Sequence, residues 1–284
     1  MSLITLENNH LKATLNTYGG QLESLIDKHT MVDHVWKYNA TIWPRRTALC
    51  FPFCGRSQDN KYTYAGQEYD IPNHGFARQR EFSLLSCSAN NLELQDHFDS
   101  TTLAIYPFKY NLVLSYHLEG ASLVVKYHVT NQGDSIMYYS IGSHYAYQLP
   151  LLQSQCALWF SCPQHGGPLD LSNGSLQPDI LKGRSCVPLL GLIDNASIIF
   201  DLQQLNTSWV GIGTKDQVFT KVRGDGFRYV LAWAPVGRDN PFTCIEFWDG
   251  MAHIGTYSNK IEEKFAVRTL NGGESRTYSQ LISF

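Results

Sequence analysis

Alternation of apolar and polar residues with a period of two is the strongest pattern in this chain. In "NLVLSYHLEGASLVVKYHVTN" (111–131), every second residue is Leu, Tyr or Val on both sides of a turn at Gly120. Successive side chains of a strand point to opposite faces, so this spacing predicts a hairpin with one buried face. The same pattern surrounds Gly66 in "NKYTYAGQEYDIP" (60–72) and the glycine pair Gly19 and Gly20 in "HLKATLNTYGGQLESLI" (10–26). We predict a strand pair in each.

No segment combines apolar recurrence at helical spacing with helix caps, and the 16 Tyr, 14 Phe and 6 Trp residues favour pleated surfaces. The predicted fold class is therefore all-β, a large antiparallel β-sandwich. The 284 residues are within the range of one large all-β unit, so we expect a single domain over residues 1–284. The segment 161–185, rich in Gly, Pro and Ser, is predicted to be a long surface excursion between strands.

Charge and hydropathy narrow the range of partners. Lys and Arg total 22 against 25 Asp and Glu, the net charge is -3, and the basic residues are scattered, so no nucleic-acid partner is expected. The amino terminus has no signal-peptide pattern and no apolar stretch is long enough to span a bilayer. We expect a soluble, cytoplasmic protein with no membrane contact; the oligomeric state is left open.

The seven cysteines are dispersed and form no pair of CxxC units, so we expect reduced thiols, mostly buried. The sequence contains no glycine-rich phosphate loop, no HExxH and no GxSxG. It therefore predicts neither a metal nor another cofactor.

Two histidines occupy unusual settings. His74 lies in "IPNHGFARQREF" (71–82), which otherwise reads as a strand leading out of a turn, and Pro72 and Gly75 indicate that the turn presents the imidazole. His144 ends an apolar run in "YYSIGSHYAYQLP", as a histidine would that emerges from a buried strand into a cleft. Taken singly, each position suits a packed core histidine equally well.

Glu246 is the most anomalous residue, because "PFTCIEFWDG" (241–250) surrounds a carboxylate with apolar side chains. Desolvating a carboxylate is unfavourable unless the group has partners or a function. The alternative is a residue that faces outward on an edge strand. The flanking Phe247 and Trp248 would also suit a stacking wall for a sugar ring.

Several arginines could contact a ligand. Arg45 and Arg46 precede an apolar segment that Arg56 ends, and arginines in such places are usually solvated rim residues. Arg78 follows His74 and could equally form an ion pair with Glu81.

Together these residues resemble a known family. The segments "FPFCGRSQDNKYTYAGQEYDIPNHGFAR", "GSHYAYQLP" and "CIEFWDG" are similar, in this order, to three motifs of the aldose 1-epimerase family, known also as galactose mutarotases, in its shorter bacterial branch. The likeness runs nearly end to end. It implies a β-supersandwich with a sugar bound in an open cleft, and a small-molecule sugar as the substrate.

The resemblance also implies roles. Glu246 would be the general base, ionised, and His144 the general acid, at least partly protonated. His74 would bind the sugar near the reacting oxygens, and Arg56 or Arg46 would hold hydroxyl groups or an anion.

Three points depart from the family pattern or stay open. Phe247 stands where the glutamate motif usually has proline, and Tyr145 where proline commonly follows the second histidine. These changes affect the expected substrate preference more than the chemistry. A family aspartate that contacts the sugar could be Asp194 or Asp201.

Three other functions compete with a hexose mutarotase. A hexose-6-phosphate mutarotase would use the same pair with an arginine cluster, for which Arg45, Arg46 and Arg78 are available. A non-catalytic carbohydrate-binding or sensing protein could share the fold, since fold does not fix function. A β-sandwich lyase or hydrolase is the weakest of the three.

Overall fold

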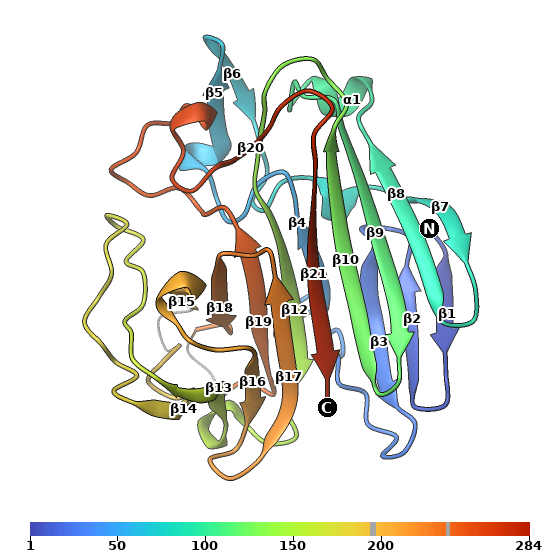
Figure 1. Ribbon diagram of the computed structural model, residues 1–284, viewed down its shortest axis with the longest axis vertical. Coiled ribbons are helices and arrows are strands. Elements are labelled where there is room, and N and C mark those ends of the chain that lie inside the picture. The colour runs from blue at the N-terminus through green and yellow to red at the C-terminus, as the bar shows by residue number, and fades with distance from the viewer. Residues whose placement is uncertain (194–196, 237–238) are drawn as a thin grey trace.

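The structure of the chain, a computed structural model, describes residues 1–193, 197–236 and 239–284. Two large antiparallel sheets dominate it (Figure 1). The nine-stranded sheet has the order β14 (Arg184–Pro188), β13 (Ala157–Gln164), β16 (Val210–Gly213), β17 (Val218–Asp225), β21 (Ser275–Ser283), β10 (Ser122–Asn131), β9 (Tyr110–Glu119), β8 (Asn91–His97), β7 (Ser83–Cys87). The five-stranded sheet has the order β15 (Ser197–Asp201), β18 (Tyr229–Trp233), β19 (Phe242–Asp249), β12 (Ile141–Gln148), β4 (Thr47–Cys50).

Smaller elements complete the fold. They are the sheet β1 (Leu3–Glu7), β2 (Leu11–Asn16), β3 (Gln21–Asp27), the pair β5 (Lys61–Tyr64), β6 (Gln67–Asp70), the pair β11 (Met137–Tyr139), β20 (Arg268–Leu270), and the one-turn helix α1 (Ser100–Leu103). In the described residues, no helix is long and apolar enough to cross a membrane. The predicted all-β class and large antiparallel β-sandwich are confirmed.

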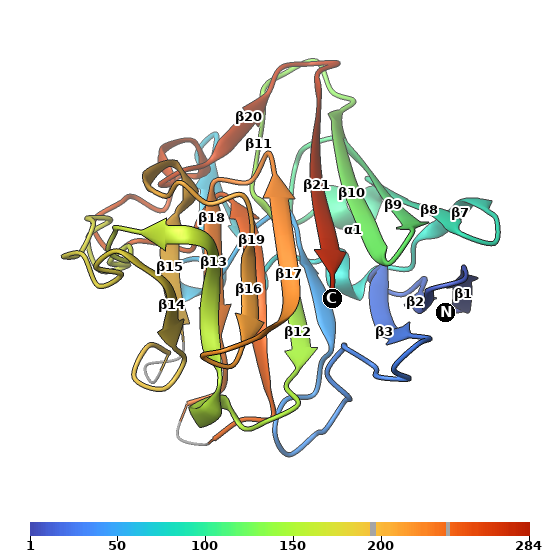
Figure 2. The ribbon, with the colours of Figure 1, turned by 60° about the horizontal axis from the view of Figure 1, so that its bottom comes forward.

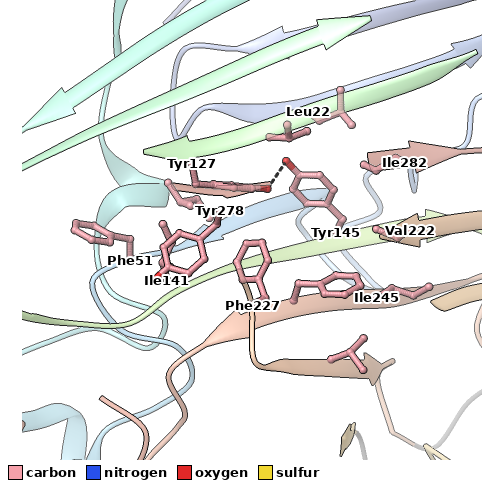
Figure 3. Close-up of a cluster of buried hydrophobic side chains, with 14 of the residues drawn as sticks. Leu22, Phe51, Tyr127, Ile141, Tyr145, Val222, Phe227, Ile245, Tyr278 and Ile282 are labelled. Atoms are coloured by element: carbon pink, nitrogen blue, oxygen red, sulfur yellow. Dashed lines mark hydrogen bonds between the residues drawn. The ribbon is translucent and has the colours of Figure 1, made fainter. Parts of the chain in front are cut away.

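The core lies between the two large sheets. Figures 1 and 2 show β12, β18 and β19 layered against β16, β17 and β21. Side chains of both inner faces meet there, including Ile245 of β19 and Val222 of β17 (Figure 3). Tyrosines fill much of this core, and several of their hydroxyls are paired: that of Tyr127 donates to Oε1 of Gln280 (2.7 Å) and lies 3.1 Å from the hydroxyl of Tyr145. Such a tyrosine adds apolar area without leaving its own hydroxyl unpaired.

The three hairpins expected from sequence alternation are confirmed. β9 pairs with β10, with Leu118 opposite Leu123, and the apolar positions of both strands are buried. β5 pairs with β6, where the rings of Tyr62 and Tyr69 stack at 5.3 Å. β2 pairs with β3.

Two local expectations were wrong. After the turn, residues 71–82 form a single 3₁₀ turn (Ala77–Gln79) instead of a strand. The segment 161–185 is not only a surface excursion, because β13 extends to Gln164 and Leu169 and Leu181 are buried. The Leu169 amide donates to the carbonyl of Ile199 (2.7 Å), which ties this segment to β15.

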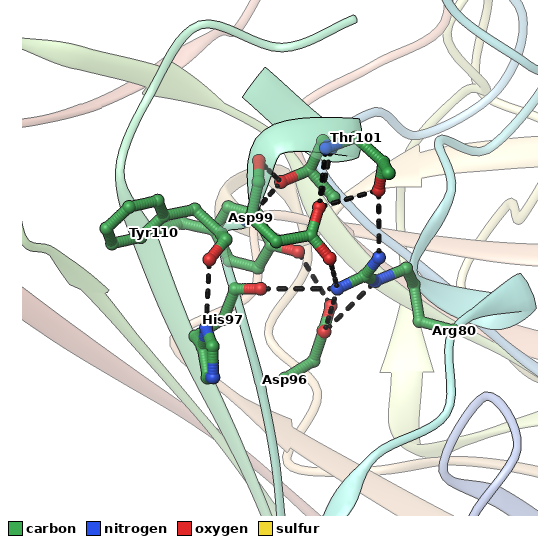
Figure 4. Close-up of polar contacts among 8 residues, drawn as sticks. Arg80, Asp96, His97, Asp99, Thr101 and Tyr110 are labelled. Atoms are coloured by element: carbon green, nitrogen blue, oxygen red, sulfur yellow. Dashed lines mark hydrogen bonds and ion pairs between the residues drawn. The ribbon is translucent and has the colours of Figure 1, made fainter. Parts of the chain in front are cut away.

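Arg80 fastens the segment that carries His74 to the large sheet (Figure 4). Its guanidinium donates to Oδ1 of Asp96 (3.0 and 3.1 Å) and forms an ion pair with Asp99 (2.9 Å). The buried Asp96 also accepts from the hydroxyl of Tyr110 (2.7 Å). A buried carboxylate with several donors is a stable anchor, so the segment that follows His74 has a fixed position.

Candidate active site

One face of the five-stranded sheet forms the floor of a cavity of about 400 Å³. Along β19, Ile245 and Phe247 face the core between the sheets, so the alternating Glu246 and Trp248 face the cavity. The pairing of Gly142 with Trp248 sets the register between β12 and β19 that brings His144 opposite Glu246. The remaining lining comes from five loops and includes Trp43, Arg45, Gly55, Asn73, His74, Arg78, Leu171 and Ala252. A concave site of this volume suits a small molecule.

Glu246 lies at the centre of this floor and is only 2% exposed. Its Oε1 is 3.3 Å from Nε2 of His144, whereas Oε2 is buried without a hydrogen-bond partner among the described residues. Burial raises the pKa of its carboxyl well above the ordinary value. β19 lies between β18 and β12, so the reading of Glu246 as an exposed edge-strand residue does not hold.

The His144 ring is held between aromatic side chains. It stacks on Trp43 with ring centroids 5.2 Å apart and meets the edge of Trp233 at 5.4 Å. Its Nδ1 is buried and, within the described chain, has no hydrogen-bond partner. Burial, followed by the nearby His74, lowers the pKa of the imidazole well below its usual value. Burial thus favours a neutral imidazole beside a protonated carboxyl, whereas the family resemblance implies an ionised pair.

His74 is presented by a turn, as Pro72 and Gly75 predict: the Gly75 amide donates to the carbonyl of Pro72 (2.8 Å). His74 itself has a φ of 65°, in the left-handed region, and Gly75 has a φ of 70°. A Cβ on Gly75 would lie 2.2 Å from the carbonyl oxygen of Phe51, so only glycine fits there. The His74 ring lies edge-on to His144, with centroids 5.3 Å apart.

The arginines divide into two groups. Arg45 and Arg78 line the cavity, whereas Arg46 and Arg56 do not. Arg46 forms an ion pair with Glu23, and Arg56 is exposed, so the structure does not place either where it could hold the sugar as expected.

Arg78 does not pair with Glu81, which instead binds the amino terminus of the chain (2.9 Å). Nη2 of Arg78 donates to the carbonyl of Asn73 (2.6 Å), while Nε of Arg78 is buried without a partner in the described residues.

The expected sugar-binding aspartate is not found in the described part of the cavity. Asp201 forms an ion pair with Arg228 (2.9 Å) and does not line the cavity. Asp194 lies outside the described residues.

Sequence reasoning missed much of the aromatic lining. Trp43, in "TIWPRR", and Trp233, in "LAWAP", carried no signal beyond being tryptophans near other candidates. Of the two aromatic residues considered as a stacking wall, Trp248 lines the cavity and Phe247 packs in the core. Three indoles around a carboxyl and two imidazoles can stack on the apolar faces of a sugar ring.

Gly142 makes room for one of these indoles. A Cβ there would lie 2.4 Å from Cδ1 of Trp248 and 3.0 Å from the carbonyl oxygen of Phe247. We expect Gly142→Ala to lower the free energy of unfolding by about 1–3 kcal/mol, the usual effect of overpacking, measured by urea denaturation. Gly255→Ala is the matched control, because its Cβ would meet only the carbonyl oxygen of Ser172, at 3.7 Å. Equal stability of the two variants would contradict the packing of Trp248 described above.

The site also has three side chains of types that bind metals. Ligating atoms of His144, Cys244 and Glu246 all lie within 4.8 Å of one another. Burial raises the pKa of the Cys244 thiol well above its usual value. Its side chain packs with Trp36, Ala146 and Phe242 in a buried apolar cluster, so we interpret Cys244 as a packing residue on the same strand as Glu246.

A β-sandwich with a buried carboxyl–imidazole pair in a tryptophan-lined cavity is typical of an enzyme that acts on a sugar by acid–base chemistry. The chain belongs to the aldose 1-epimerase family, which residues 2–159 match, and is on that ground an isomerase of the mutarotase type. This confirms the family that the sequence motifs resemble.

Three individual proteins illustrate what this chain is similar to. The plasmid-encoded protein LacX of Lactococcus lactis subsp. lactis is 26% identical over 283 residues, which cover 92% of each chain. A galactose mutarotase-like protein from Lactobacillus casei has a TM-score of 0.89 and 25% identity, over 99% of each chain. A galactose mutarotase related enzyme from Lactobacillus acidophilus shares the fold, with a TM-score of 0.88 and 24% identity over 99% of this chain and 97% of that one.

Proposed function

We propose that this protein interconverts the α and β anomers of an aldohexose, with Glu246 and His144 as its acid–base pair and the whole chain acting as one domain. The observation that carries the proposal is the 3.3 Å distance between Oε1 of Glu246 and Nε2 of His144 inside the tryptophan-lined cavity. Both groups also keep a buried polar atom, Oε2 and Nδ1 respectively, that has no hydrogen-bond partner among the residues that the structure describes.

The reaction needs one base and one acid. The hemiacetal opens when the anomeric hydroxyl loses its proton while the ring oxygen gains one, and after rotation about C1–C2 the ring closes on its opposite face. Glu246 takes the proton of the anomeric hydroxyl and His144 protonates the ring oxygen. No metal or nucleotide takes part in these steps.

The pair works if it holds one proton in total. During ring opening His144 gives a proton to the ring oxygen while Glu246 gains one from the anomeric hydroxyl, and ring closure reverses both transfers. A carboxylate beside an imidazolium and a carboxyl beside a neutral imidazole differ only in where this proton lies. Burial raises the pKa of Glu246 and lowers that of His144, so desolvation by the protein favours the arrangement in which the carboxyl carries this proton. Sugar hydroxyls entering the site supply the polar contacts that shift the proton toward His144.

The other lining residues bind and orient the sugar. The indoles of Trp43, Trp233 and Trp248 stack on the ring and exclude water. His74, whose ring lies 5.6 Å from that of Trp248, donates a hydrogen bond close to the reacting oxygens.

A second candidate substrate is a hexose 6-phosphate. Arg45 and Arg78 both line the cavity, and in the described structure neither forms an ion pair with a carboxylate. Burial, followed by the charge of Arg45, lowers the pKa of Arg78, as expected for two guanidinium groups that lack a counter-anion. A bound phosphate would compensate both charges.

Polarimetry on freshly dissolved α-glucose, α-galactose and glucose 6-phosphate tests the function and separates the substrates. We expect the protein to speed mutarotation of a free hexose well above the buffer rate. A strong preference for the phosphorylated sugar, abolished by Arg78→Met, would instead establish the second candidate. Sugar binding by calorimetry with mutarotation at the buffer rate would overturn both and leave a binding protein.

A further inference from the structure

The Nδ1 atom of His74 faces two donors behind the cavity wall. The Gly55 amide donates to it at 3.1 Å, and Sγ of Cys50 lies 3.1 Å away from the same atom. Cys50 is completely buried. A ring nitrogen that accepts a backbone N–H carries no proton of its own, so a neutral His74 must carry its proton on Nε2.

The same geometry bears on whether Cys50 is a thiol or a thiolate. A thiolate beside an imidazolium would place an N–H of the ring against the N–H of Gly55, two positive ends facing each other. A thiol avoids this conflict, because its S–H donates to Nδ1 alongside the Gly55 amide. The geometry thus favours a neutral thiol against a neutral imidazole, although, against the effect of burial, the hydrogen bond from Cys54 and the charge of His74 lower the pKa of the Cys50 thiol.

The backbone fixes the rest of His74. Its amide donates to the carbonyl of Gly55 (2.9 Å), and its carbonyl accepts from the amide of Phe51 (3.1 Å). With backbone and Nδ1 both held, the remaining freedom of the ring is small, and Nε2–H points to the side away from Cys50, where the cavity lies.

We propose that Cys50 is a positioning residue, whose thiol, together with the Gly55 amide, holds His74 as a fixed Nε2–H donor toward the sugar. The inference rests on the proposed sugar chemistry for its consequence, and on geometry alone for the tautomer. A neutral donor can hydrogen-bond a sugar oxygen but cannot remove a proton, so His74 binds and orients the substrate while proton transfer stays with Glu246 and His144.

The fold explains why a cysteine fits at this point. Cys50 ends β4 opposite Gly142, the missing side chain of Gly142 leaves space for the Trp248 ring, and the His74 ring meets that indole edge-on at 5.6 Å. A sulfur is large enough to reach Nδ1 from β4. Serine, with its shorter C–O bond, keeps the donor but reaches less far, and alanine removes the donor.

The test combines ring NMR with kinetics. Long-range ¹H–¹⁵N correlations of the histidine rings, assigned to His74 by comparison with His74→Gln, separate the two neutral tautomers and the imidazolium in wild-type protein. We expect Nε2–H with an unprotonated Nδ1. We also expect Cys50→Ala to reduce kcat/KM for mutarotation about two- to tenfold, the effect of one net hydrogen bond, with Cys50→Ser in between and a changed Nδ1 signal in both. Cys156→Ser, a buried cysteine outside the cavity lining, should match wild type.

A neutral His74 ring that carries its proton on Nδ1 would overturn the proposal. So would a Cys50→Ala protein that is folded by thermal unfolding and equals Cys156→Ser in kcat and KM. The ring spectrum does not depend on turnover, so the expected tautomer in a protein without mutarotase activity would refute the proposed function and leave the tautomer assignment standing.

Discussion

Glu246→Gln is expected to slow mutarotation at least about a hundredfold, the lower end of what one general base contributes, with the protein still folded. Glutamine keeps the size of the side chain and its contact with the imidazole, but cannot accept the anomeric proton. Polarimetry at saturating sugar gives kcat directly. Because the stacking residues are untouched, KM should change far less than kcat.

The same substitution should stabilise the protein at alkaline pH, which provides an independent check. The folded-state pKa of Glu246 lies well above its ordinary value of 4.5, so its contribution to stability is fully present below pH 4.5 and is lost as the pH rises toward the folded pKa. Each pH unit in that window changes the free energy of unfolding by about 1.4 kcal/mol. Glutamine does not titrate, so the stability of the variant relative to wild type should increase as the pH rises above 4.5.

Glu119→Gln, at an exposed hairpin end, is the matched control. It should alter neither the mutarotation rate nor the pH dependence of the free energy of unfolding. If Glu246→Gln kept more than a tenth of the wild-type kcat, Glu246 would not be the base. A stability gap that stayed constant with pH would show that its carboxyl titrates normally.

The sequence predicted most reliably where local alternation and burial agree. Leu118 and Leu123 flank a glycine turn and alternate with polar residues on both sides, so the hairpin of β9 and β10 needed no tertiary information. The burial of Glu246 was likewise readable from its apolar neighbours. Its position between two other strands was not, because strand order depends on contacts between distant segments.

The arginines show more clearly what could not be predicted from the sequence. Arg45 and Arg46 are adjacent in the sequence, yet one lines the cavity and the other pairs with Glu23. Neighbouring residues on an extended segment point to opposite sides, so the choice between them requires knowing which side faces the cavity. Trp43 was missed for the same reason, because its role depends on stacking over His144 from a loop distant in sequence.

The departures from the family motifs gain an explanation from the same alternation. Phe247 and Tyr145 each follow a catalytic candidate by one position, so both point into the core and away from the cavity. Phe247 packs near Phe227, with ring centroids 6.1 Å apart, and Tyr145 contacts the Tyr127 hydroxyl. They therefore affect how the sheets pack and do not line the cavity, so under the proposed function substrate preference would come from the residues that do.

His144→Asn is the second substitution expected to have a large effect, again at least about a hundredfold on kcat. Asparagine can hydrogen-bond the ring oxygen of the sugar but cannot transfer a proton to it at neutral pH. The loss should appear for both anomers, because the proton that His144 gives during ring opening is the one it recovers during closure. His29→Asn, at an exposed position, is the control for the chemical change.

The free energy of unfolding, measured at decreasing pH for wild type and His144→Asn, tests whether His144 is buried as a neutral imidazole. Its folded-state pKa lies well below the ordinary 6.5, so its contribution to stability is present above pH 6.5 and is lost as the pH falls toward the folded pKa. His144→Asn loses the stacking on Trp43 and should be less stable than wild type at pH 8. This gap should narrow between pH 6.5 and 5, since only wild type must then keep a buried imidazole neutral while its unfolded state takes up a proton. A gap that widens on acidification would mean that the folded protein holds His144 as an imidazolium paired with an ionised Glu246, and that burial does not dominate this site.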